Sequence, residues 1–327
     1  MYDKRNEIGG NIMTYEEKLQ QYKDWIFRRS AYQMALAIIG IDKQTVAPSA
    51  GAAYRDERSA YLAGELFSIE TDPAMVQLLK ELKDDPKIDG DNKRAVELYY
   101  KQAMDTMCIP KEEFVAYQKL RDESFDAWIK AKSQSDYSIF EPYLKKIIEV
   151  SKKMYRYRNS DKNLYDQMLD DYEPGMTQEK YDVFFAALKE RLVPLIQKIT
   201  QAKQKNEAFL HQEFPIEDQK KFMTQLLEYL HFDSSWGYQN ESEHPFTSWT
   251  CENDCRTTTK YVKNDVVSAV LSTVHEVGHA YYEHDVDPKY DGMILSEGIS
   301  SGMHESQSRL CENYLARTTA FWTYHYP

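Results

Sequence analysis

The sequence predicts a mainly α-helical protein that folds as one large domain. Long segments carry apolar and aromatic residues at the spacing of a helix with one buried face. Proline and glycine are scarce, at 11 and 12 of 327 residues, and no Gly/Ser-rich linker or internal repeat divides the chain. The β-branched and aromatic residues typical of strands gather mainly before residue 264. A small β element beside the helices is therefore expected.

Three predicted helices show the apolar stripe most clearly, at residues 14–39, 111–133 and 179–204. The stripes consist of Leu19, Tyr22, Ile26, Tyr32, Met34 and Leu36 in the first helix, Phe114, Tyr117, Leu120, Phe125, Trp128 and Ile129 in the second, and Phe184, Phe185, Leu188, Leu192, Leu195 and Ile199 in the third. We expect all three stripes to be buried in the core rather than to bind a cofactor. Short loops rich in Asp and Pro separate the helices.

A further helix is expected between the β-rich stretch and Pro288. Asn264 or Asp265 is a candidate N-cap, because a short polar side chain can accept a bond from the first free N–H groups. Proline disfavours helical geometry in the residue before it, so this helix should end before Asp287. Its apolar face consists of Val266, Val267, Val270, Leu271 and Val274. This helix carries the most informative motif of the chain, at residues 275–279.

The motif reads His-Glu-Val-Gly-His, the HExxH pattern. Residues four apart lie on the same face of a helix, so His275 and His279 can both bind one metal ion. Glu276 follows the first of them and can act as a base toward a metal-bound water. Two histidines on a helix surface beside an ordinary glutamate are the simpler interpretation, but the helical context favours a zinc site.

The third ligand should come from another segment, because catalytic zinc commonly has three protein ligands and one open position. Small residues at 300–302 precede another predicted helix, whose apolar residues are Leu310, Tyr314, Leu315 and Phe321. A short helical hairpin would let Glu305 face the first helix. His304 competes with it, since imidazole binds zinc at least as readily as carboxylate, and a solvated charged face remains a third interpretation of the pair.

The charge and the cysteines argue against several classes of protein. A net charge of −12 offers no basic face to nucleic acid. The sequence has no signal peptide and no apolar run long enough for a membrane, which predicts a cytoplasmic protein with free thiols. Cys251 and Cys255 lack a second pair that would complete a structural zinc site. Residues 1–12 are polar and are expected to form a disordered tail, so that the domain covers residues 13–327.

Four motifs in order make the chain resemble the M32 family of metallocarboxypeptidases, the thermostable carboxypeptidase 1 type. Residues 244–246 resemble the HPF motif of that family, and residues 254–258 its DxRxT motif. HExxH at residues 275–279 comes next, and residues 304–308 resemble its HESQS segment. The upstream helices are also similar, for instance at residues 165–175, so the resemblance extends over essentially the whole chain.

The resemblance implies a gluzincin-like helical domain with a deep zinc-containing cleft. It implies His275, His279 and Glu305 as the metal ligands and Glu276 as the general base. His244 and Arg256, in the two upstream motifs, are implied as substrate contacts near the metal. It also implies broad specificity for peptide substrates and a homodimer.

The sequence also departs from the family pattern. Cys311 stands where the family commonly has a bulky aromatic residue. Family members continue beyond the position of Pro327, so we expect this domain to be truncated at its C-terminus. Some gluzincin-like enzymes place an acid four residues after the ligand glutamate, where it braces a zinc-bound histidine. That position is Arg309 here, so the sequence does not identify the bracing group.

The expected function is therefore a metallocarboxypeptidase that removes single C-terminal residues with zinc, cobalt or another divalent ion. Arg256 could bind the substrate carboxylate bidentately, or it could pair with Asp254 or Glu252 and stiffen a loop. The strand-like run at residues 256–262 could pair with an extended peptide. Two alternatives stay open, namely a zinc oligoendopeptidase or dipeptidase, and a catalytically impaired helical fragment that only binds metal.

Overall fold

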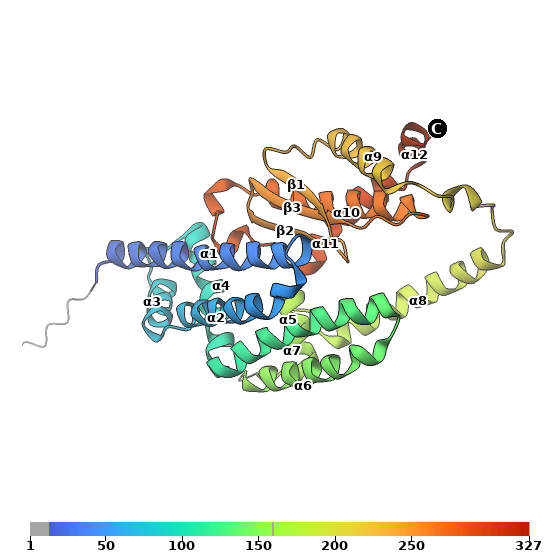
Figure 1. Cartoon of the computed structure of the whole chain (residues 1–327). Coiled ribbons are helices and arrows are strands. Elements are labelled where there is room, and N and C mark those ends of the chain that lie inside the picture. The colour runs from blue at the N-terminus through green and yellow to red at the C-terminus, as the bar shows by residue number, and fades with distance from the viewer. Residues whose placement is uncertain (1–12, 159, 327) are drawn as a thin grey trace, which may run out of the picture.

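The structure is a computed structural model that describes residues 13–158 and 160–326. The tail expected at residues 1–12 lies outside the described residues. The described chain is mainly helical with one small sheet, as predicted (Figure 1). Its elements are α1 (Tyr15–Thr45), α2 (Ala52–Glu70), α3 (Pro73–Asp84), α4 (Gly90–Met107), α5 (Lys111–Gln134), α6 (Glu141–Tyr157), α7 (Leu164–Tyr172), α8 (Gln178–Gln201), α9 (Ile216–Tyr229), β1 (Gly237–Glu241), β2 (Thr247–Cys251), β3 (Asp254–Thr259), α10 (Val266–His284), α11 (Ser301–Arg309), the π-helical segment η6 (Leu310–Ala316) and α12 (Thr319–His325).

Side chains cap the helices that matter for the site. Thr14 and Glu17 form a capping box that starts α1. Asp265 is the N-cap of α10 and accepts a bond from the N–H of Ser268, which decides between the two predicted cap residues. Ser300 caps α11 in the same way through the N–H of Met303. Polar residues at these positions satisfy N–H groups that have no partner within the helix.

The long helix α1 lies between the sheet and α2 (Figure 1). It packs on β2 and on α2, α2 packs on α5, α5 on α6, and α6 on α7. One apolar cluster joins α1, α3 and α4 around Leu79 and Tyr99. A second cluster surrounds α10, with side chains from α9, β3, η6 and α12. The second cluster holds α10 firmly against its neighbours, and this helix carries the HExxH motif.

The sheet has the strand order β1-β3-β2, with β3 parallel to β1 and antiparallel to β2. The expected β element before HExxH is thus confirmed. The suggested pairing with an extended peptide is wrong for residues 256–259, because they belong to β3, the central strand, whose two edges are already paired. Periodicity and composition identify a strand, but its place in the sheet depends on how the three strands pack.

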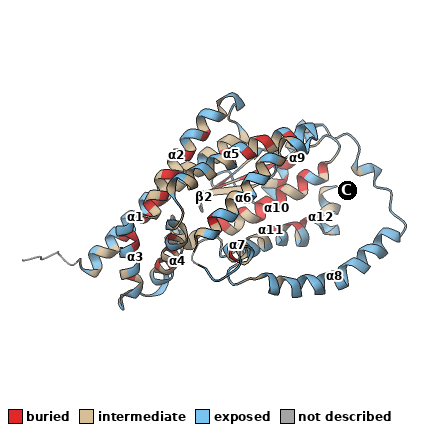
Figure 2. Cartoon of the chain, turned by 90° about the horizontal axis from the view of Figure 1, so that it is seen from below, coloured by how far each residue is buried: buried red, intermediate tan, exposed pale blue. Residues whose placement is uncertain are grey.

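The third apolar stripe is not buried, contrary to the prediction. No residue of α8 is buried, and Phe184 and Leu195 of the stripe are 56% and 52% exposed. Figure 2 shows α8 standing clear of the body of the described chain, with exposed residues along its length. Apolar spacing predicts that a helix has one apolar face, but it does not say whether another element covers that face.

None of the helices in the described part of the chain combines the length and the apolar composition that a membrane span requires.

Candidate functional site

Three side chains converge at the HExxH motif on α10. The Nε2 atoms of His275 and His279 lie 3.6 and 3.5 Å from Oε2 of Glu305. All three ligand atoms lie within 4.8 Å of one another. Two ligands bound tetrahedrally at roughly 2.0–2.1 Å from a zinc ion would lie about 3.3 Å apart. The donor set of two imidazoles and one carboxylate, at these separations, therefore fits a zinc-type metal ion.

Glu305 reaches the histidines because α11 packs very closely on α10. A Cβ added to Gly278 would lie 2.8 Å from Cα of Ser308 and 2.9 Å from the carbonyl oxygen of Gln307. These two atoms belong to the backbone, so they cannot move aside as a flexible side chain would. The glycine between the two histidines thus allows the close approach of the two helices that carry the three candidate ligand side chains.

Replacing Gly278 by Ala should push α11 away from α10 and separate Glu305 from the two histidines. We expect the free energy of unfolding to fall by about 1–3 kcal/mol, as in other overpacked cores, and zinc affinity to fall with it. Urea unfolding with chelator and a competition titration with zinc would measure both. Gly40 of α1 is the matched control, since a Cβ added there meets no atom within 4 Å. A G278A chain as stable as G40A would contradict the prediction.

The second ring nitrogen of His275 is held by Glu312, which lies in the π-helical segment η6. Nδ1 of His275 lies 2.9 Å from Oε2 of Glu312. Arg309 donates to the same oxygen at 2.9 Å, and Arg317 donates to Oε1 at 2.5 Å. Burial raises the pKa of Glu312, but the hydrogen bonds from Arg317 and His275 outweigh burial and hold it below the usual value. Glu312 is thus an ionised acceptor that orients His275, and it supplies the bracing group that Arg309 could not.

The second ring nitrogen of His279 contacts His304. The two Nδ1 atoms lie 2.6 Å apart, and Nε2 of His304 lies 2.6 Å from Oε1 of Glu283. His304 is not among the three converging ligand groups, so of the two candidates for the third ligand the geometry favours Glu305. Burial, and then the neighbouring histidines His304 and His275, lower the pKa of His279 to about 4. His279 is therefore neutral at pH 7, as metal binding requires.

Glu276 is buried and held by a hydroxyl group. Its Oε2 accepts a hydrogen bond from Oγ1 of Thr247 at 2.7 Å, and the same hydroxyl lies 2.9 Å from the carbonyl oxygen of Glu276. Burial raises the pKa of the Glu276 carboxyl, and the bond from Thr247 opposes this effect. A carboxyl group with a raised pKa beside the candidate metal position is suited to take up and release a proton.

Glu276 opens onto a cavity of about 600 Å³. The cavity is lined by His275, Glu276 and Glu305, by His244 of the HPF motif, and by four cationic side chains, Lys132, Lys260, Arg309 and Arg317. Each of these cations already has a carboxylate partner, which is Glu243 for the two lysines and Glu312 for the two arginines. The cavity therefore offers space for a ligand next to the metal position, with paired charges around it.

Arg256 lies elsewhere. Its guanidinium makes a bidentate pair with Asp254, with Nε and Nη2 at 2.7 and 2.8 Å from the two carboxylate oxygens. It does not line the cavity beside Glu276. This geometry favours the alternative that Arg256 stiffens the turn between β2 and β3.

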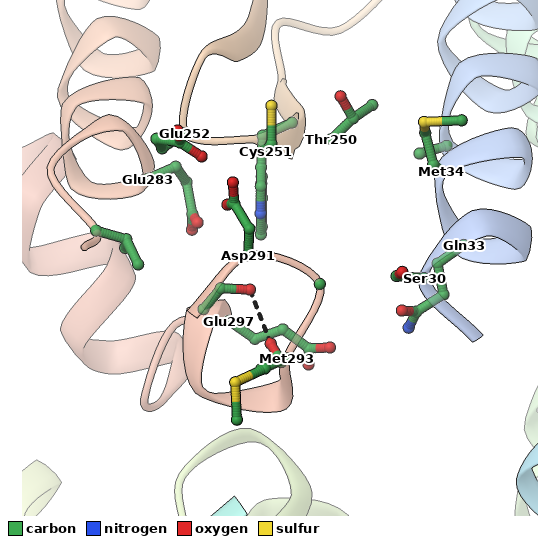
Figure 3. Close-up of a pocket in the computed structure, with 15 residues that line it drawn as sticks. Ser30, Gln33, Met34, Thr250, Cys251, Glu252, Glu283, Asp291, Met293 and Glu297 are labelled. Carbon is green, nitrogen blue, oxygen red and sulfur yellow. Dashed lines mark hydrogen bonds between the residues drawn. The ribbon is translucent and has the colours of Figure 1, made fainter. Parts of the chain in front are cut away.

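A second, smaller cavity of about 190 Å³ lies between α1 and the end of β2 (Figure 3). Glu283 of α10 lines this cavity. Three carboxyl groups from other segments, those of Glu252, Asp291 and Glu297, line it as well. Burial and the neighbouring Glu252 raise the pKa of Asp291 to about 6. Glu283 lines this cavity and also contacts Nε2 of His304, which in turn contacts His279 of the candidate metal site.

Three residues of the site had no role in the sequence-based prediction, namely Glu312, Glu283 and Thr247. Glu283 follows His279 by four residues on α10, so helical spacing already places it on the face of the two histidines. Thr247 directly follows the HPF motif, but nothing in the sequence places it against Glu276. Glu312 reaches His275 through the wider turn of a π-helix, a feature that apolar periodicity does not predict.

Comparisons with known proteins agree with this geometry. The family model described as carboxypeptidase Taq (M32) metallopeptidase matches residues 21–327. Carboxypeptidase 1 of Bacillus subtilis is 38% identical over 319 residues, which are 96% of this chain and 63% of that protein. Thermostable carboxypeptidase 1 of Thermus thermophilus is 31% identical over 314 residues, covering 92% of this chain and 62% of that protein.

The crystal structure of BsuCP superposes with a TM-score of 0.91 at 36% identity and covers 94% of this chain and 62% of its own. This chain thus spans slightly less than two thirds of the length of the relatives that it matches. The family model nevertheless covers nearly all of it, with the HExxH helix and the segment of Glu305 inside the matched range. The chain belongs to the carboxypeptidase Taq (M32) metallopeptidase family.

Proposed function

We propose that this chain is a zinc-dependent metallocarboxypeptidase that hydrolyses single C-terminal residues from peptides. The observation that carries the proposal is the convergence of His275, His279 and Glu305 beside the buried carboxyl of Glu276. Cobalt or another divalent ion could replace zinc, since two imidazoles and one carboxylate also suit other transition metals. The names of the relatives, carboxypeptidase 1 and thermostable carboxypeptidase 1, support the reaction class.

The chemistry divides between the ion and Glu276. When bound, the ion lowers the pKa of a water molecule to about 7 and polarises the peptide carbonyl group. Glu276 accepts a proton from the attacking water as the bond to the carbonyl carbon forms, and it delivers that proton to the amide nitrogen as the C–N bond breaks. Thr247 keeps the carboxyl of Glu276 in place through its hydrogen bond. His244, on the wall of the same cavity, is proposed to contact the substrate.

The role of Arg256 as a contact for the substrate carboxylate stays a prediction, and its pair with Asp254 argues for a structural role instead. The cytoplasmic location and the homodimer also stay predictions.

Mass spectrometry of a mixed peptide and its C-amidated twin, each incubated with the purified zinc-loaded chain, tests the proposal. From the free peptide we expect a ladder of products, each shorter than the last by one C-terminal residue. The amidated peptide should give no such ladder. Cleavage of both peptides would indicate an endopeptidase. Bound zinc without any cleavage would favour a metal-binding chain that needs a further segment, an alternative motivated by the 63% coverage of the Bacillus relative.

A further inference from the structure

The two metal-site histidines are held by different partners on their outer nitrogens. His275 contacts a carboxylate directly, through Oε2 of Glu312. His279 contacts a second histidine, His304, which in turn contacts the carboxylate of Glu283. An ionised carboxylate accepts hydrogen bonds and donates none, whereas a neutral imidazole has one donor nitrogen and one acceptor nitrogen. His304 can therefore accept a hydrogen bond from His279 in only one of its two tautomers.

That tautomer follows from the direction of the bonds. Two imidazole nitrogens 2.6 Å apart need one donor and one acceptor. His279 turns Nε2 toward Oε2 of Glu305, at 3.5 Å, so metal binding needs the lone pair on Nε2 and leaves the ring proton on Nδ1. Nδ1 of His304 must then accept. Its own proton is on Nε2, where Oε1 of Glu283 accepts it at 2.6 Å.

We propose that His304 is a positioning residue for the metal site, acting on His279, while Glu283 holds His304 in the tautomer that can accept. The inference rests on the proposed metal site. Glu283 is 2% exposed, so bulk water does not replace it as the partner of His304. Two rings fix the plane of His304, with Trp249 stacked at 5.6 Å and Tyr282 edge-on at 5.1 Å. His304 thus acts on the ion through His279, although it immediately precedes the ligand Glu305 in the chain.

Zinc affinity, measured by competition with a chelator, tests the first half of the inference. We expect His304→Ala to weaken zinc binding by about 10–100-fold, the usual effect of removing a group that orients a metal ligand. His304→Gln should recover part of the loss, because its amide can accept from His279 and donate to Glu283. His284→Ala is the matched control, since His284 lies on α10 but contacts the backbone of Glu252 and the ring of Trp236. Unchanged zinc affinity in His304→Ala would overturn the inference.

Nitrogen NMR of the ¹⁵N-histidine-labelled, zinc-loaded wild-type chain tests the tautomer, even if the alanine variant does not fold. We expect the lone pair of His304 on Nδ1 and its proton on Nε2. Glu283→Leu should shift population to the tautomer protonated on Nδ1, because it removes the acceptor of the Nε2 proton. A wild-type His304 protonated on Nδ1 would refute the proposed direction of the bonds.

Neither measurement needs peptide hydrolysis, so the two proposals can fail separately. A chain that shows the predicted tautomer and the predicted loss of affinity, but yields no peptide ladder, supports the positioning role and contradicts the proposed function. A chain that yields a ladder, with unchanged affinity in His304→Ala, supports the function and contradicts the positioning role.

Discussion

Replacing Glu276 by Gln is expected to lower kcat/KM for C-terminal hydrolysis by about 10²–10⁴-fold, the usual contribution of a general base. Gln has the shape of Glu and can still accept the hydrogen bond that Thr247 donates to this side chain, but it cannot take up a proton from water. Glu276 is not among the three converging ligand groups, so zinc affinity should stay close to that of the wild type. The combination of lost turnover and retained metal identifies a base rather than a ligand.

Steady-state kinetics on a free-carboxylate peptide, with zinc content measured on the same samples, would check this expectation. Glu217→Gln is a suitable control, because that side chain is 79% exposed on α9 and belongs to neither the cavity nor the ligand set. It carries the same change of charge without touching the site. Turnover of E276Q equal to that of E217Q would rule out Glu276 as the base.

Zinc should also stabilise the fold, because the proposed ligands come from two helices that only the folded chain brings together. At a free zinc concentration 100 times the dissociation constant, the free energy of unfolding should rise by about 2.7 kcal/mol, provided that the unfolded chain does not bind the ion. His275→Ala removes one of the three ligand groups and should abolish most of this gain. Urea unfolding with zinc and with chelator would measure the difference.

His211→Ala serves as the control for this experiment, since His211 is an exposed histidine outside the metal group. It should keep the full zinc-dependent stabilisation. An equal zinc effect in H275A and H211A would mean that zinc stabilises the chain through another site. The ligand assignment, and with it the proposed function, would then be untenable.

Residue type and short-range spacing were sufficient to predict those features that depend on contacts between neighbours in the sequence. The HExxH helix begins at a predicted cap, Asp265, and it ends at His284, before the proline predicted to limit it. Both features depend on contacts within a few residues. The two histidines share a face for the same reason, because the geometry of a helix repeats at every turn. The motif thus predicted two histidines on one face, and the structure brings them together with Glu305 of a separate segment.

Local pattern was insufficient for α8 and β3. The apolar stripe of α8 has the same spacing as stripes that are partly buried elsewhere, yet its residues are exposed. The composition of β3 predicted a strand, but its central position in the sheet follows from partners on both sides. Spacing describes one element, whereas burial and pairing depend on a second element that packs against it.

The amino-acid pattern was enough to identify a helical fold, the HExxH helix and the family, because each depends on residue type and short-range spacing. Three of the groups that contact the site residues could be placed only by packing. Thr247 reaches Glu276 across 29 residues, His304 reaches His279 across 25, and Glu312 reaches His275 across 37. Bonds between such distant residues exist only after β2, α10, α11 and η6 have packed together. Which nitrogen of each histidine ring carries the proton, and hence which nitrogen can bind a metal, depends on that packing.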